Sequence, residues 1–169
     1  MGAADQRFFD ALRRAHFPPE RNHLASHITL FHQLPPSALG ELDRLCRAIG
    51  AETPPPAARV TGVYSLGRGV AFTVESAELI AIRARIAEHF HGLLGVQDRA
   101  TPRLHITVQN HITVQNKVDA ATAQALLVDL DGNFRPRPLV ITGLAAHHYR
   151  GGPWELAFER KFRVMRRGY

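Results

Sequence analysis

The chain has 169 residues, of which 45% are hydrophobic and 21% are charged, and its formal net charge at pH 7 is +6. This is ordinary globular usage, and no apolar run approaches the roughly 18 residues that a membrane span needs, so we expect neither a disordered chain nor a membrane protein. The basic surplus suits partners that carry phosphate, although basic residues gathered near one end more often form a solvated surface.

The opening residues and the single cysteine bear on the compartment. Residues 1–6 lack the apolar core of a signal peptide and the Ser or Thr of a myristoylation signal, so we expect a cytoplasmic protein. Cys46 is the only cysteine and lies in a helical pattern, which excludes an internal disulfide and predicts a place in the core. We also expect a monomer without a membrane partner.

Apolar spacing, proline and glycine divide the first half of the chain into five elements. The pattern predicts a helix over residues 4–16, a strand over 27–30, a helix over 39–49, and a hairpin whose strands cover 59–66 and 70–75. Gly67-Arg68-Gly69 forms the turn of that hairpin, and Pro18-Pro19 ends the first helix.

The pattern of the second half predicts a similar order of helices and strands. Ser76 begins a long helix whose apolar stripe runs to Leu93, and Gly95 marks its end. A strand over 105–108 follows, then a helix over 119–130, and then a hairpin with strands over 139–149 and 154–162.

The repeated order of elements indicates a duplicated unit. Short sequence motifs also recur, since Val60-Thr61-Gly62 resembles Ile141-Thr142-Gly143. We therefore predict an α+β fold, a bilobal and pseudo-two-fold pair of small, mostly antiparallel sheets with outer helices and a central groove. The whole chain, 1–169, forms one such domain, with one lobe over about 20–95 and the other over about 100–165.

Two short motifs of nearly the same sequence are the main functional signal. They are His27-Ile28-Thr29-Leu30 and His105-Ile106-Thr107-Val108, 78 residues apart. Side chains two apart on a strand share a face, so each motif presents an imidazole beside a hydroxyl. Two such strands across a groove supply two proton-transfer groups and two hydrogen-bond donors, which suits acid–base chemistry on a phosphate ester.

A third copy follows the second at once, with His111 and Thr113 in the same strand phase as His105 and Thr107. The separation of 48 residues from His27 to Glu75 recurs from His111 to Glu159, which favours the third copy. The short connection from the preceding helix favours His105, since use of the third copy lengthens that loop to about 16 residues. We prefer His105 with Thr107 and keep His111 with Thr113 as the alternative.

The pair of His-x-Thr motifs in matching positions of two similar halves resembles the 2H phosphoesterase superfamily, in particular its bacterial 2′-5′ RNA ligase-like branch. The resemblance covers essentially the whole chain. It implies a hydrolase with catalytic His27 and His105 and substrate-binding Thr29 and Thr107, acting without metal or other cofactor. The implied substrate is an RNA terminus or nucleotide with a 2′,3′-cyclic phosphate or a 2′-5′ phosphodiester.

The residues themselves leave other functions open. A non-catalytic module that binds RNA ends or nucleotides would use the same groove and positive charge, and a metal-dependent hydrolase is a third hypothesis. The sequence shows no histidine or cysteine pair with the spacing of zinc ligands, so we expect no metal. Further candidates for contacts to a base or phosphate are Tyr149, Arg150, Trp154 and Arg103.

Overall fold

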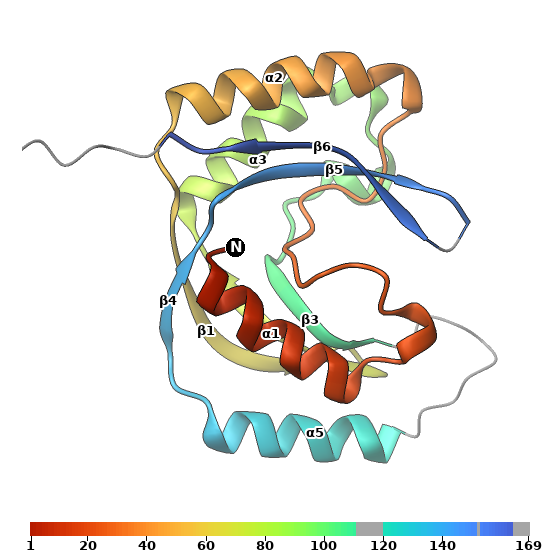
Figure 1. The fold of residues 1–169 in the computed structure, drawn as a ribbon, viewed down its shortest axis with the longest axis vertical. Coiled ribbons are helices and arrows are strands. Elements are labelled where there is room, and N and C mark those ends of the chain that lie inside the picture. The colour runs from red at the N-terminus through yellow and green to blue at the C-terminus, as the bar shows by residue number, and fades with distance from the viewer. Residues whose placement is uncertain (111–119, 152, 164–169) are drawn as a thin grey trace, which may run out of the picture.

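The computed structural model describes residues 1–110, 120–151 and 153–163. Its strands are β1 (Ala57–Ser65), β2 (Gly69–Glu75), β3 (His105–Asn110), β4 (Arg137–Val140), β5 (Gly143–Tyr149) and β6 (Trp154–Lys161). They form a four-stranded sheet in the order β3-β2-β1-β4 and a two-stranded sheet, β5-β6, and every pair is antiparallel (Figure 1).

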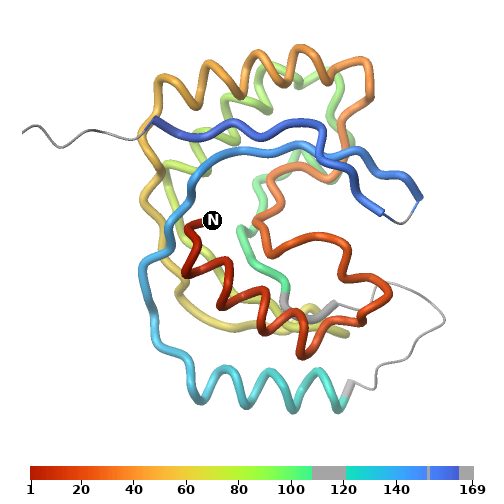
Figure 2. Tube along the Cα trace, viewed as in Figure 1, coloured from red at the N-terminus to blue at the C-terminus, as the bar shows by residue number. Residues whose placement is uncertain are grey.

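Helices cover the two sheets from outside. They are α1 (Ala3–His16), α2 (Leu39–Glu52), α3 (Ala77–His89), α4 (Val96–Arg99) and α5 (Ala120–Asn133), with short 3₁₀ turns at Pro19–Arg21, Pro36–Ala38 and His91–Leu93. Helix α2 packs on the two-stranded sheet and α5 packs on β1 and β2 at the opposite end of the molecule, while α1 lies between them against β3 (Figures 1 and 2). The predicted α+β arrangement of two small antiparallel sheets with outer helices is confirmed.

The sheets do not follow the two halves of the sequence. Strands β3 and β4 come from the second half, yet they flank the β1-β2 hairpin of the first half. The strand predicted over 139–149 is interrupted at Ile141 and Thr142, so that β4 joins the larger sheet and β5 joins the smaller one. Pairing between distant strands depends on tertiary packing, and a local repeat in sequence does not specify it.

Local signals account for the turns and for one helix start. Gly67 and Gly151 have φ of 83° and 84°, values that glycine adopts without steric cost, and they lie in the two predicted hairpin turns. The Ser76 side chain accepts a hydrogen bond from the Leu79 amide at 3.1 Å and so caps α3. The helix ends earlier than predicted, at His89, which leaves Leu93 outside the apolar stripe and 50% exposed.

The hydrophobic core lies against the larger sheet. Phe72 on β2 meets Phe9 of α1 with ring centroids 5.3 Å apart and Phe134, just after α5, at 5.6 Å. Ile106 on β3 is fully buried in the same core. This packing holds β3, and with it the second motif, against α1. Within the described part of the chain, no helix is both long enough and apolar enough to cross a bilayer.

Candidate active site

The two predicted motifs meet directly. An isolated antiparallel bridge joins Ile28 of the first motif to Ile106 of β3. The bridge joins these two residues alone, and its antiparallel direction sets the His27 end of the first motif toward Thr107 and the Thr29 end toward His105. Both isoleucines pack against the core. Alternation along β3 turns His105 and Thr107 to the face opposite Ile106, whereas the first motif forms no strand beyond the bridge at Ile28.

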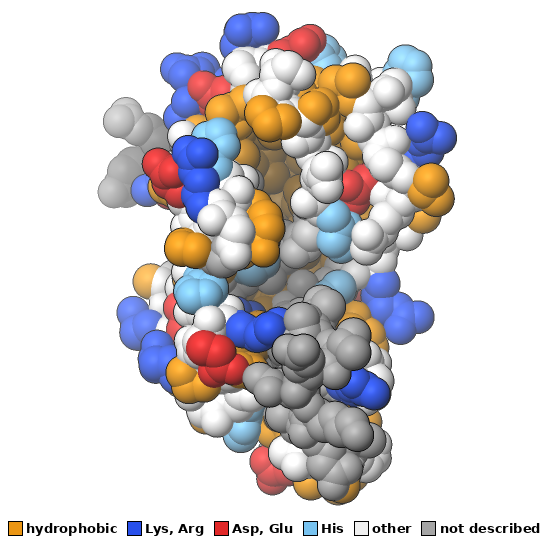
Figure 3. Space-filling model, turned by 90° about the vertical axis from the view of Figure 1, so that its right-hand side faces the viewer, with side chains coloured by type: hydrophobic (Ala, Val, Ile, Leu, Met, Phe, Trp, Pro, Cys, Tyr) orange, Lys and Arg blue, Asp and Glu red, His pale blue; other side chains and the backbone are white. Residues whose placement is uncertain are grey.

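This arrangement has a two-fold character. In each motif a histidine directly precedes the bridged isoleucine and a threonine directly follows it, and the charge of His105 acts on His27 across the bridge. His27 is exposed, and Thr29, His105 and Thr107 are partly exposed, so all four reach solvent. Figure 3 shows a hollow along the middle of one face of the molecule, with histidine side chains gathered around it.

The two imidazoles are held by the same hydrogen bond. Nδ1 of His27 lies 2.8 Å from the carbonyl oxygen of Ala25, and Nδ1 of His105 lies 2.8 Å from that of Arg103, two residues earlier in each case. A carbonyl only accepts, so Nδ1 carries the hydrogen in both rings. Nε2 is therefore the nitrogen that each ring offers to a ligand.

The surroundings of His27 favour its neutral form. Burial among protein atoms lowers the pKa of His27, and the charges of Arg13, His147 and His105 lower it further, against the opposing hydrogen bond to Ala25. Residue 27 is nonetheless exposed to solvent. At neutral pH, Nε2 of His27 accordingly has a free lone pair.

An aromatic and a cation flank His105. The ring of Tyr64 on β1 meets the His105 ring edge-on with centroids 5.9 Å apart, and the Arg103 guanidinium lies 5.2 Å from the centre of the Tyr64 ring. Burial raises the pKa of Tyr64, and Arg103 partly offsets this. Sequence reasoning considered Arg103 but missed Tyr64, whose position follows only from the pairing of Tyr64 with Ala71 and of Ala71 with Thr107.

A third imidazole, His147 of β5, belongs to the same region. Its charge acts on His27, and burial lowers the pKa of His147 itself. The sequence offered no signal for this, since the strand of His147 and the motif of His27 are 120 residues apart. Beyond His147 on the hairpin, the exposed rings of Tyr149 and Trp154 contact each other at an interplanar angle of 46°, with centroids 4.9 Å apart.

Other predicted candidates are engaged elsewhere or lie outside the described residues. Arg150 forms an ion pair with Glu155 at 3.0 Å across the hairpin. His111 and Thr113, the alternative second motif, lie outside the described residues. Among the residues that the structure describes, no group of three or more His, Cys, Asp or Glu side chains is arranged to hold a metal ion.

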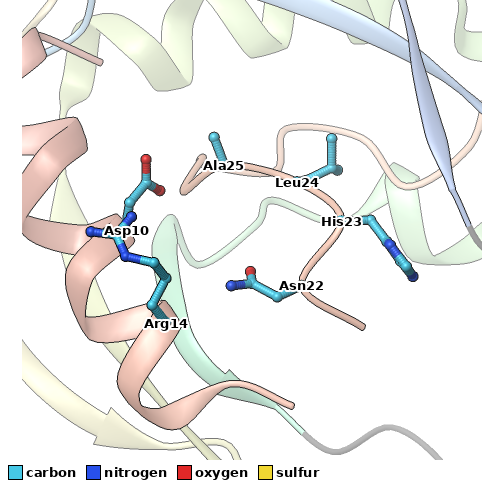
Figure 4. Close-up of a pocket in the computed structure, with 6 residues that line it drawn as sticks. All are labelled: Asp10, Arg14, Asn22, His23, Leu24 and Ala25. Atoms are coloured by element: carbon cyan, nitrogen blue, oxygen red, sulfur yellow. The ribbon is translucent and has the colours of Figure 1, made fainter. Parts of the chain in front are cut away.

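A shallow polar pocket of about 200 Å³ lies behind the first motif rather than at the four motif side chains. It separates α1 from the segment that leads to His27, and it is lined by Asp10, Arg14, Asn22, His23, Leu24 and Ala25 (Figure 4). Ala25 in this lining is the residue whose carbonyl holds the His27 ring. The pocket therefore borders the segment that supports the His27 ring, and it is not the site of the four motif side chains.

Comparisons with known proteins add the following findings. The family model of the 2′-5′ RNA ligase superfamily matches residues 2–153, a range that includes both motifs. The crystal structure of TT0787 of Thermus thermophilus is similar with a TM-score of 0.50 and 13% identity, over 95% of this chain and 94% of that chain. At this identity the likeness concerns the fold alone. No curated protein matches the sequence significantly.

Proposed function

Because this chain belongs to the 2′-5′ RNA ligase superfamily, we propose that it is a metal-independent phosphoesterase of the 2H type. Its substrate is a 2′,3′-cyclic phosphate or a 2′-5′ phosphodiester of RNA or a nucleotide. The observation that carries the proposal is the antiparallel bridge between Ile28 and Ile106, which supports a joint site for His27 and His105. Both rings are anchored through Nδ1, which leaves the two Nε2 atoms for the phosphate.

In the hydrolytic direction, we assign His27 as the general base. Its lowered pKa supports this role, since the neutral ring takes a proton from water at neutral pH. His105 is then the acid that donates a proton from Nε2 to the departing ribose oxygen. Attack and departure are roughly in line at phosphorus, which requires the two groups on different sides of the phosphate. Ligation runs the same steps backward with the two roles exchanged.

The hydroxyl groups of the two motif threonines stabilise the negative charge that develops on the phosphate. Thr29 and Thr107 each follow one of the two bridged isoleucines and are partly exposed. Each hydroxyl donates a hydrogen bond to a non-bridging oxygen, a contribution of the oxyanion-hole type. Because the negative charge is stabilised by hydrogen bonds and by the imidazolium ring, the reaction needs no metal ion.

The groove also offers contacts for the rest of the substrate. Tyr64 beside His105 and the exposed pair Tyr149 and Trp154 present ring faces of the kind on which nucleobases stack. The net charge of +6 favours an anionic partner. These features support a nucleotide or an RNA end as the substrate class.

Measurement of turnover distinguishes this proposal from a non-catalytic binding module and from a metal-dependent hydrolase. The protein is incubated with a 2′,3′-cyclic nucleotide in the presence of EDTA, and the release of a nucleoside monophosphate is measured by chromatography. Monophosphate at an undiminished rate under chelation supports the proposal. Tight binding without product indicates the non-catalytic binding module, and activity that chelation abolishes indicates a metal-dependent hydrolase.

A further inference from the structure

Helix α1 contacts both motifs through one face. Asp10 and Arg13 are three residues apart, a spacing that places two side chains side by side on a helix. Asp10 bonds the residue immediately before His27, and Arg13 bonds the backbone of Thr107. The helix thus connects two segments that are about 80 residues apart in the chain.

The contact with the first motif is a closed hydrogen-bond network. Oδ1 of Asp10 accepts from the backbone amide of Ser26 at 2.7 Å and from its hydroxyl at 2.8 Å. Gln6 Nε2 donates to Asp10 at 3.1 Å and to the Ser26 carbonyl at 3.0 Å. Ser26 is only 4% exposed. The peptide groups on both sides of this residue are therefore held, and the start of the His27 segment is held with them.

The contact with the second motif uses a buried cation. Arg13 is 5% exposed, its Nη1 donates to the Thr107 carbonyl at 2.9 Å, and its Nε donates to Oδ1 of Asn22 at 3.0 Å. The guanidinium also stacks 4.1 Å from the centre of the Phe17 ring. Within the described part of the chain it has no carboxylate at ion-pair distance. Its hydrogen-bond partners are neutral, and the charge of Asp10 acts on it without a direct ion pair. A buried cation held in this way is costly, which points to a role for its charge.

We propose that Asp10 and Arg13 are positioning residues, which hold the two motifs at a fixed separation and register on α1. This inference rests on the proposed function, because the positions that matter are those of His27, His105 and the two threonines. Neither side chain needs to touch the substrate. A displacement of about 1 Å in such a support lowers the rate by as much as roughly a hundredfold.

The charge of Arg13 adds an electrostatic effect that geometry alone would not produce. The charges that act on His27 are those of Arg13 from α1 and, when protonated, of His147 from β5 and His105 from β3, and each disfavours a positive charge on the His27 ring. Asp10 stays ionised next to Arg13, since hydrogen bonds from Ser26 and Gln6 lower its pKa although burial raises it. Removal of the Arg13 charge therefore raises the pKa of His27.

The test measures the titration of the His27 ring by NMR, together with kcat and KM on a 2′,3′-cyclic nucleotide. Arg13→Met is expected to raise the pKa of His27 and to lower kcat by about tenfold to a hundredfold with a small change in KM. Arg13→Lys keeps the charge without the forked geometry, so the pKa stays near the wild-type value while kcat falls. Arg7→Met removes one exposed charge from the same helix and serves as the matched control.

Asp10 is tested in parallel. Asp10→Ala is expected to lower kcat, and Asp10→Asn, which keeps an acceptor for the Ser26 amide, is expected to restore part of it. An unchanged His27 titration in Arg13→Met, or losses of kcat no larger than in Arg7→Met, would overturn the inference. If Arg13→Met does not fold, Arg13→Lys and the Asp10 pair decide the positioning claim. If the wild-type protein shows no turnover, the proposed function fails, whereas the titration still tests the effect of Arg13.

Discussion

Replacement of His27 by alanine is the sharpest test of the proposed chemistry. A proton-transfer residue contributes about 10²- to 10⁴-fold to a rate, which corresponds to roughly 3–5 kcal/mol of transition-state stabilisation. We expect a loss of this size in kcat for cyclic nucleotide hydrolysis. His27→Asn is a matched variant, because its side-chain amide still donates toward the Ala25 carbonyl but does not titrate near neutral pH. It should be as inactive as His27→Ala.

The fold should survive both His27 substitutions. The exposed ring makes one hydrogen bond to a backbone carbonyl, and such a bond contributes about 0.5–1.5 kcal/mol to the free energy of unfolding. For a domain of this size, that is a decrease in Tm of about 1–6 °C. The assay is steady-state hydrolysis in EDTA with a thermal melt of each variant. Retention of more than a tenth of the wild-type kcat by a folded variant would refute a proton-transfer role for His27.

The same assay compares the two candidate second histidines. His105→Ala should reduce kcat as much as His27→Ala does, because each group takes one half of the proton transfer. His111→Ala should then leave kcat near the wild-type value. The reverse result would move the second motif to the third copy, and full activity in both variants would mean that the copies substitute for each other or that neither takes part.

Three further predictions concern stability. The lowered pKa of His27 and of His147 means that the unfolded state binds more protons than the fold as pH falls from about 6.5 to the folded pKa, so urea denaturation should show lower stability at pH 5.5 than at pH 7.5. His27→Asn should reduce this pH dependence, and an equal slope in both proteins would contradict the assignment. Ile106→Ala should lower the free energy of unfolding by about 2–5 kcal/mol, because Ile106 is fully buried, with Ile106→Val costing about 0.5–1.5 kcal/mol in the same denaturation. Gly50→Ala should cost about 1–3 kcal/mol, since its Cβ would lie 2.6 Å from the Lys161 carbonyl oxygen, and a melt unchanged from wild type would exclude this clash.

Several local elements could be predicted because their signals lie within a few residues. The first helix was expected over 4–16 and is observed as Ala3–His16, where the apolar spacing ends before two prolines. The hairpin turns at Gly67 and Gly151 follow from the freedom of glycine at positive φ. The Ser76 cap on α3 is also a local hydrogen bond. Each signal concerns contacts between near neighbours, which a linear pattern records.

The assembly of the candidate site needed the tertiary structure. The sequence identified two motifs and the face that each presents, because alternation along a strand is local. It did not show that Ile28 pairs with Ile106, nor that Arg13 reaches the Thr107 carbonyl from a helix 94 residues earlier. The sequence also did not show that the chain passes from the larger sheet to the smaller one at residues 141 and 142.

The sequence by itself thus determined which residue types are available for acid–base chemistry and in which local geometry they stand. Only the tertiary structure decided which of them meet, because strand pairing and helix docking depend on burial and on hydrogen bonds between segments far apart in the chain. The pKa of His27 illustrates the division. Its imidazole was evident in the sequence, but the groups that lower its pKa come from α1, β3 and β5 and were brought together by folding.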